Sequence, residues 1–422
     1  MHYHQRNPEG TRMIRYPGIK SCDIYLPSED TDVYRWAVIA CDQFTSQPEY
    51  WNRVTEIVGN APSALKIMQP EVFLDRGDRS PEICSEMQRY LDEGILVKRV
   101  EDGFIAVERT THSGKRLGMV CALDLECYDF RDMNHMVRAT EDTVTDRLPA
   151  RIAIREKAAV EMPHVMVLID DPDRTVIEPL FENTDSVMLY DTELMEGGGH
   201  IRGWAVTSES EKQKVSDALF RLLERSDGFL YAAGDGNHSL AAAKMYWEEK
   251  KKAISPEEAE NDPARFVLVE LVNLYSEALI FRPVHRLVKG CSMDELLTGF
   301  KGYLAGRNMC LTEGEDLIFV SDGTEENYSV EGSGGKLPVA ILQDYLDRFA
   351  SSRGGIEMDY IHGDDDLKSL CKDDSTVGIL LKIFNKMELF PGVRAGGNLP
   401  RKTFSMGDAR EKRYYMECRK LR

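Results

Sequence analysis

The chain reads FLYAAGDGNHSLAAAK over residues 229–244, and this stretch predicts a strand, a tight turn and a helix in direct succession. The apolar run 228–233 is typical of a buried strand, the glycines break it, and the alanine-rich run favours a helix. The turn would lie at a helix N-terminus, where backbone N–H groups without intrahelical partners hold anions. Junctions of this kind are where α/β enzymes bind their ligands.

The same turn carries two side chains that suit acid–base catalysis. Asp235 could accept a proton from a hydroxyl group, and His238 could donate one to a transferring oxygen. Gly234, Gly236 and Asn237 would shape a phosphate site around them. An Asx turn that merely caps the helix explains the same residues, so both interpretations stay open at this point.

A second strand-to-helix junction is predicted nearer the N-terminus. Residues 36–41 read WAVIAC, which indicates a strand, and Asp42 lies in the turn that follows. Ser46 with Pro48 and Glu49 has the pattern of a capped helix start. Asp42 is therefore the second carboxylate that we expect in a site.

Strands and helices alternate irregularly along the rest of the chain, which predicts a mixed α/β or α+β protein with mixed sheets and flanking helices. A hairpin is expected at 104–123, with its turn at 112–115. Further strands are expected at 164–169, 266–273, 279–288 and 377–384, and helices at 81–93, 146–160, 209–225, 294–303 and 338–351.

Composition narrows the classes of partner. The net charge of −19 and pI of about 5.0 argue against nucleic acid and anionic membranes, both of which require basic surfaces. Nine scattered cysteines without a C-x-x-C pair indicate free thiols in a reducing compartment and no zinc site. Because no secretory signal and no apolar run of about 18 residues is present, we expect a cytoplasmic protein.

Six further residues are candidates for binding a phosphorylated cofactor or for proton transfer: Arg138, Glu141, His285, Arg286, Lys402 and Thr403. Arginine suits bidentate phosphate contacts, but charged strand ends and surface ion pairs explain each of these residues as well. The chain contains no G-x-G-x-x-G, H-E-x-x-H or G-x-S-x-G motif. We predict no metal ligands in the chain.

Taken in order, these segments resemble the prokaryotic family known as domain of unknown function 1015. The resemblance covers most of the chain and depends on residues 38–49, 138–143, 234–238, 283–288 and 399–404. Members usually read Ala-Asp-Gly-His-His-Arg at the central turn, where this chain has Asn237 and Ser239 in place of the first His and the Arg. Arg286 or Lys402 could then supply the missing phosphate contact.

The Asp-Gly-x-His turn is also similar to the signature of ParB/sulfiredoxin-like proteins, a group that includes nucleotide-dependent kinases of free serine. In those kinases the aspartate lies by the substrate hydroxyl and the histidine by nucleotide phosphate. The resemblance implies a ParB-like core at 1–59 and 206–290, an inserted lobe at 60–205, and an α/β region at 291–422 that completes the site. A homodimer stays open.

The resemblance thus implies a phosphotransferase that uses ATP or ADP with Mg²⁺ to phosphorylate a small hydroxylated metabolite such as free serine. Asp235, Asp42 or Glu141 would take the substrate proton. Arg286, Lys402 and Arg138 would neutralise the transferring charge, since phosphoryl transfer depends on positioning and charge. Two alternatives remain: a non-catalytic nucleotide- or metabolite-binding regulatory protein, and a ParB-like nuclease or DNA-associated NTPase, which the net charge disfavours.

Overall fold

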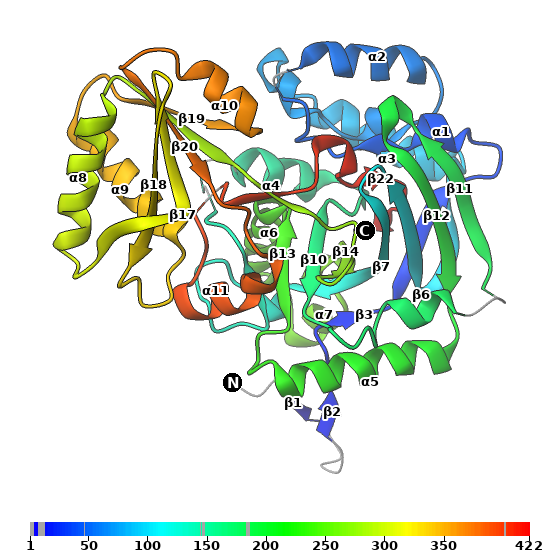
Figure 1. The fold of residues 1–422 in the computed structure, drawn as a ribbon. Helices are drawn as coiled ribbons and strands as arrows, with labels where there is room; N and C mark the ends of the chain where they lie inside the picture. The colour runs from blue at the N-terminus through cyan, green and yellow to red at the C-terminus, as the bar shows by residue number, and fades with distance from the viewer. Residues whose placement is uncertain are drawn as a thin grey trace. The chain divides into compact units, whose positions relative to one another are not determined.

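The computed structural model of the chain describes residues 4–6, 13–45, 47–143, 145, 148–182, 186–400 and 402–422 (Figure 1). Two compact units are present. Unit 1 comprises residues 1–139, 143–279 and 407–422, and unit 2 comprises residues 140–142 and 280–406. Both units combine β-sheets with flanking helices, which confirms the predicted mixed α/β class.

A ten-stranded mixed sheet forms the centre of unit 1. Its main path runs β11 (Met188–Leu194), β12 (Gly199–Val206), β6 (Leu96–Thr111), β7 (Gly114–Asp124), β14 (Phe266–Asn273), β10 (Val165–Ile169), β13 (Tyr231–Asp235) and β8 (Val137–Ala139). β3 (Ile19–Lys20) pairs with β7, and β4 (Cys22–Pro27) pairs with β6. The pairs β10–β14 and β13–β8 are parallel, and the other pairs are antiparallel.

Both faces of this sheet are buried. In β6, Ile105 and Val107 belong to one hydrophobic core, and Phe104 and Ala106 belong to the other, as the alternation of strand side chains requires. The first core includes residues of α1 (Val33–Trp36), α2 (Pro48–Val58) and α3 (Ser80–Asp92). The second includes residues of α5 (Glu209–Arg225) and α6 (Asn237–Lys251).

Several predicted elements are present. The hairpin β6–β7 turns at residues 112–113, and α5 has the predicted bounds. α4 (Leu148–Lys157) occupies part of the helix expected at 146–160, and α7 (Pro256–Asn261) follows α6. Ser46, the predicted cap of α2, lies outside the described residues.

Six described strands of 60–205, namely β6, β7, β8, β10, β11 and β12, lie in the same sheet as β13 and β14. The compact units have other bounds than the predicted core and lobe. That 60–205 is an insertion into a ParB-like core stays a prediction. Among the described helices, none has the length and apolar character needed to cross a membrane.

Unit 2 contains a five-stranded antiparallel sheet in the order β18 (Thr324–Glu331), β17 (Cys310–Ser321), β20 (Thr376–Leu381), β16 (His285–Lys289) and β19 (Glu357–Ile361). α8 (Met293–Ala305) and α9 (Pro338–Ser352) contribute to its main core, which includes Phe300, Phe319 and Leu342. α10 (Asp364–Leu370) packs through Leu367 in a smaller core. β15 (Phe281–Pro283) pairs with β21 (Phe404–Met406), and α11 spans Leu389–Gly396.

The last sixteen residues of the chain, 407–422, return to unit 1. β22 (Tyr414–Tyr415) pairs with β5 (Val38–Ile39), and β23 (Arg419–Lys420) pairs with β9 (Val160–Glu161). Arg413, which directly precedes β22 and is 3% exposed, donates to Glu270 on β14 at 2.7 Å and to Glu417. The C-terminal segment is therefore joined to the sheet through a buried ionic network.

Replacing Arg413 by Met should destabilise the chain by about 3–5 kcal/mol, because it leaves two buried carboxylates, Glu270 and Glu417, without their shared cation. Urea unfolding measures the loss. The control is Arg89→Met, since Arg89 forms solvent-exposed pairs with Glu86 and Glu93 that contribute little. A loss at Arg413 no larger than that at Arg89 would contradict the importance of the network.

Candidate functional site

The predicted turn joins β13 to α6. β13 ends at Asp235, Gly236 adopts the left-handed conformation with φ of 79°, and Asn237 begins the helix. The register with β10 shifts between Met166 and Val167, so Gly234 is an extra residue there, and such bulges re-aim nearby side chains. A Cβ on Gly236 would lie 3.0 Å from the ring of His164 and from the backbone of Val165. Only glycine fits this position without strain.

Lys412 links the two predicted junctions. Its Nζ lies 3.0 Å from Asp235 Oδ2, and its charge also lowers the pKa of Asp42, the acid of the first junction. Lys412 comes from the C-terminal segment, and its backbone carbonyl accepts a hydrogen bond from the buried Arg109. The structure thus brings Asp42 and Asp235 to one cluster with a fixed lysine.

The two carboxylate oxygens of Asp42 have different partners, His164 and Gln43. His164 Nε2 is 3.5 Å from Asp42 Oδ2, while the Gln43 amide donates to Asp42 Oδ1 at 2.8 Å. The other ring nitrogen, Nδ1, lies 2.6 Å from Tyr415 Oη. Asp42 therefore has a partner on each oxygen, which holds its carboxylate in one orientation.

Burial opposes both charges of the Asp42–His164 pair, but their mutual attraction is larger. Burial alone would raise the pKa of Asp42, yet His164, Gln43 and Lys412 together hold it well below its usual 3.8. Burial alone would lower the pKa of His164, yet the adjacent Tyr415 oxygen and the Asp42 carboxylate together raise it well above 6.5. We conclude that both groups are charged at neutral pH, so Asp42 is a fixed anion and a weak base.

The remaining predicted residues of unit 1 differ in how they are held. Asn237 is 8% exposed, and its buried Oδ1 has no hydrogen-bond partner among the described residues, which costs free energy unless a ligand satisfies it. His238 is half-buried in the first turn of α6. Arg138 on β8 stacks over the Phe229 ring at 4.5 Å and donates to the carbonyl of His135.

Five predicted residues belong to unit 2, where backbone contacts account for much of their arrangement. Glu141 accepts a hydrogen bond from the Lys402 N–H at 3.1 Å. Arg286, 2% exposed, donates to Gln343 at 2.7 Å and to the Lys402 carbonyl at 3.0 Å. Thr403 donates to the Pro400 carbonyl. These contacts give Arg286 and Thr403 a role in holding the 399–404 segment.

Both ring nitrogens of His285 also make contacts within the fold. Its Nδ1 accepts a hydrogen bond from the Leu381 N–H at 3.1 Å, so the proton of a neutral ring resides on Nε2, which faces Asp364 at 2.9 Å. Burial is the largest influence on this ring and lowers its pKa below 6.5. A neutral imidazole with both nitrogens in use is poorly suited to holding phosphate.

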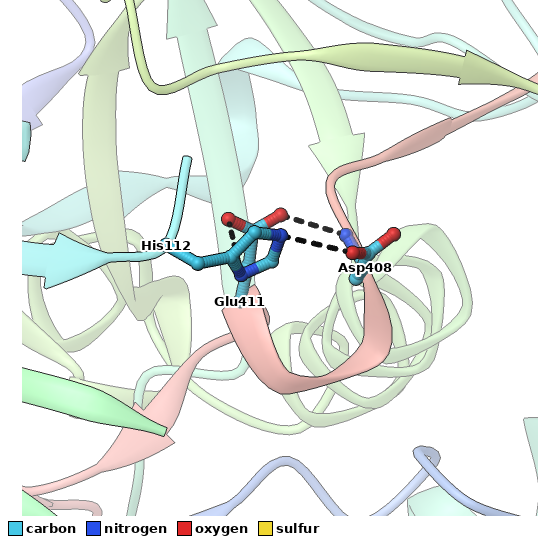
Figure 2. A group of neighbouring side chains, drawn as sticks. All are labelled: His112, Asp408 and Glu411. Atoms are coloured by element: carbon cyan, nitrogen blue, oxygen red, sulfur yellow. Dashed lines mark hydrogen bonds and ion pairs between the residues drawn. The ribbon is translucent and has the colours of Figure 1, made fainter. Parts of the chain in front are cut away.

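A separate group of possible metal ligands lies at the β6–β7 turn (Figure 2). His112 Nε2 is 3.1 Å from Asp408 Oδ2, and Nδ1 is 3.5 Å from Glu411 Oε1. The two carboxylates face different nitrogens of one ring, and Glu411 also accepts from the Asp408 N–H and from Thr111. This arrangement fits an ion-paired capping box better than a metal centre.

Sequence reasoning missed three residues of the cluster: His164, Lys412 and Tyr415. His164 begins a predicted strand and carries no motif, and Lys412 lies among other charged residues. Tyr415 carries no motif either. The position of His164 immediately before a buried strand, VMVLI, was the one local signal that could have indicated a role.

Residues 22–340 match the family described as "Protein of unknown function (DUF1015)". The chain belongs to this family. The sequence resemblance is thereby confirmed at the level of the family, and the family description assigns no activity. A comparison with curated proteins finds no match.

Solved structures give distant similarities. A free serine kinase in complex with AMP is 13% identical, with a TM-score of 0.38, and the match covers 72% of this chain and 92% of that chain. A conserved hypothetical protein from Pyrococcus furiosus is 11% identical, with a TM-score of 0.34, covering 70% and 90%. SbnI with C-terminal truncation from Staphylococcus aureus is 10% identical, with a TM-score of 0.35, covering 68% and 83%.

Gly236→Ala should disturb the cluster because its Cβ would crowd His164 as well as strain the backbone. Gly228→Ala is the matched control, with φ of 78° and no atom within 4 Å of the added Cβ. We expect both variants to lose about 1 kcal/mol for positive φ and only Gly236→Ala to lose more. Urea unfolding compares them, and equal losses would show that His164 does not pack against the turn.

His164→Gln removes a group whose pKa is raised in the folded chain. Such a group stabilises the fold fully below its ordinary 6.5 and loses that contribution as the pH rises through its raised value. The free energy of unfolding of the original chain should therefore fall relative to that of His164→Gln as the pH rises above 6.5. Urea unfolding at several pH values tests this, with His200→Gln as control; parallel curves would contradict the ion pair.

Proposed function

We propose that the chain is a phosphotransferase that transfers phosphate from a nucleotide to a small hydroxylated metabolite, such as free serine. The observation that supports this most directly is the Asp235–Lys412 pair at the N-terminus of α6, next to Asp42. A cation, a helix N-terminus and two fixed carboxylates are components that suit phosphoryl transfer. The resemblance of the Asp235-Gly236-x-His238 turn to that of free serine kinases supports free serine as the acceptor.

The first turn of α6 and Lys412 suit the phosphates. The helix cap, Gly236, has no side chain that could cap the first turn of α6, and the N-terminus of a helix attracts anions. Lys412, 12% exposed, would exchange its contact with Asp235 for one with a phosphate oxygen. The unpartnered Oδ1 of Asn237 would accept a hydrogen bond from the bound ligand. A nucleotide bound there supplies the phosphoryl group.

The two carboxylates would have different roles. Asp42 is held as an anion by His164 and Gln43, so it would orient the substrate by accepting hydrogen bonds rather than by taking a proton. Asp235, freed from Lys412 when phosphate binds, is the group that we assign to the substrate hydroxyl. This division follows from the pKa of Asp42, because a carboxylate stabilised as an anion is a weak base.

The roles of Glu141, Arg286, Lys402, Thr403 and His285 in the same reaction stay predictions. Their contacts lie within unit 2. Arg138 likewise keeps its predicted role in neutralising charge. The proposal needs none of these residues for phosphate binding, because Lys412 already supplies a cation. A comparison of nucleotide binding with and without Mg²⁺ tests whether the site requires this ion.

Binding is tested first by thermal shift with ATP, ADP, CTP and pyrophosphate, each with and without Mg²⁺ and serine. A ligand that binds only the folded state at about 100 times its Kd stabilises the fold by about 2.7 kcal/mol. We expect one nucleotide to raise the melting temperature and serine to increase the shift. No shift with any of these compounds would overturn the proposal.

Asp235→Asn and Lys412→Met should each lower the rate of product formation at least about 100-fold, because each removes a charge used in the transition state. Lys252→Met is the matched control, since its pair with Glu249 is exposed. Phosphate transfer is measured by mass spectrometry of the metabolite. Full activity in Asp235→Asn would sink the assignment, and nucleotide binding without product in the original chain would favour a regulatory binding protein.

A further inference from the structure

Unit 2 contains a cavity of about 260 Å³ to which the proposed phosphate transfer gives no role. This α8–α9 cavity is lined by residues from the end of α8, the start of α9, α11, residues 398–400 and Asp142. Leu337, Ile341 and Leu399 give it an apolar surface. Pockets for drug-sized ligands usually measure about 300–1,000 Å³, so this cavity suits a smaller metabolite.

Arg307, which follows α8 and lines the cavity, is held in place while most of its donors are unused. Its guanidinium lies 3.8 Å from the centre of the Tyr303 ring. Nη1 donates to the Tyr303 carbonyl at 3.3 Å, and Nη2 is 4.0 Å from Asp344 Oδ2, too far for a hydrogen bond. Because a guanidinium has five N–H donors, Arg307 can still bind a carboxylate through two of them.

Two further features of the lining suit an anionic group. The side chain of Lys336 forms no ion pair or hydrogen bond with any other residue that the structure describes. Leu337, the cap of α9, makes no side-chain hydrogen bond to the first turn, and the N-terminus of a helix attracts anions. Arg307, Lys336 and the start of α9 therefore favour a ligand that carries a carboxylate.

The cavity also has acceptors for a positively charged group. Asn398 and Asp142 lie on two segments that pair in parallel at Leu399 and Glu141. The buried Oδ1 of Asn398 has no hydrogen-bond partner within the described part of the chain, and the exposed Asp142 carboxylate pairs with no described cation. An unpartnered buried acceptor costs free energy, which an N–H group of a ligand would recover.

The remaining carboxylate of the lining, Asp344, already has partners within the fold. Arg348 Nε donates to Asp344 Oδ1 at 3.1 Å, and the Tyr303 hydroxyl donates to Oδ2. The charges left for a ligand are therefore two cations, Arg307 and Lys336, and one carboxylate, Asp142. A zwitterion with an apolar body matches this set.

We infer that the α8–α9 cavity binds a free amino acid with an apolar side chain. The carboxylate of the amino acid pairs with Arg307 and Lys336. Its ammonium group donates to Asp142 and to Asn398 Oδ1, and its side chain packs on the apolar lining. The inference does not depend on the proposed function, since every contact belongs to unit 2.

The test is calorimetric titration of the full-length protein with L-leucine and two analogues. 4-Methylpentanoate lacks the amino group of leucine, and 3-methylbutylamine lacks its carboxylate. We expect leucine to bind and each analogue to bind at least about tenfold more weakly, because each loses hydrogen bonds to a charged group. The inference is overturned if leucine, methionine, valine and phenylalanine all fail to bind, or if either analogue binds as tightly as leucine.

Variants of the lining locate the binding. Arg307→Gln should weaken leucine binding at least about tenfold. The matched control is Arg348→Gln, since Arg348 also pairs with Asp344 but does not line the cavity. Asn398→Leu removes the unpartnered acceptor, so it should weaken binding without lowering the free energy of unfolding. Unchanged affinity in Arg307→Gln or in Asn398→Leu would contradict the assigned contacts.

One more variant separates this site from the one proposed for serine in unit 1. Asp235→Asn should leave the affinity for leucine unchanged, whereas loss of leucine binding in this variant would overturn the inference by placing the amino acid at the other site. Failure of the phosphotransferase proposal alone would leave all of these titrations unchanged, because they need neither a nucleotide nor turnover.

Discussion

The buried guanidinium of Arg413 is the interaction on which the candidate site depends. It lies between Glu270, in the middle of the sheet of unit 1, and Glu417. Arg109 and Arg116, also buried, donate to backbone carbonyls of Lys412 and Glu411. Buried charges are tolerated only when paired and hydrogen-bonded, so the C-terminal segment has one way to lie on the sheet. Lys412 and Tyr415 reach the cluster for that reason.

Local patterns were sufficient to predict much of the fold. The strand, turn and helix at 229–244 follow from a switch between apolar and alanine-rich runs, and α5 was predicted with its observed bounds. The same reasoning placed Asp42 and Asp235 at two junctions. The third and fourth members of the cluster, His164 and Lys412, come from other parts of the chain, and no periodicity or spacing encodes which distant residues will meet.

The residues predicted to hold phosphate illustrate the limit of reading basic residues in isolation. Arg286 looked available at a strand end, but its guanidinium is buried and bonded to Gln343 and to a backbone carbonyl. The sequence did not indicate a role for Lys412, because its neighbours are also charged. An arginine whose Nε and Nη1 are already bonded within the fold has fewer donors to offer a ligand than its sequence position suggests.

Each carboxylate of the cluster faces a basic side chain: His164 lies by Asp42, and Lys412 lies by Asp235. Two cations and two carboxylates cancel, so a phosphate would be held by the helix amides and by the transfer of Lys412 from Asp235, not by an excess of positive charge. The net charge of −19 gives the chain an overall field that repels anions. Phosphate binding at this balanced site would therefore depend on these local contacts. In the proposed reaction, this exchange of partners would also free Asp235 when the substrate hydroxyl needs an acceptor, which would couple phosphate binding to the chemistry.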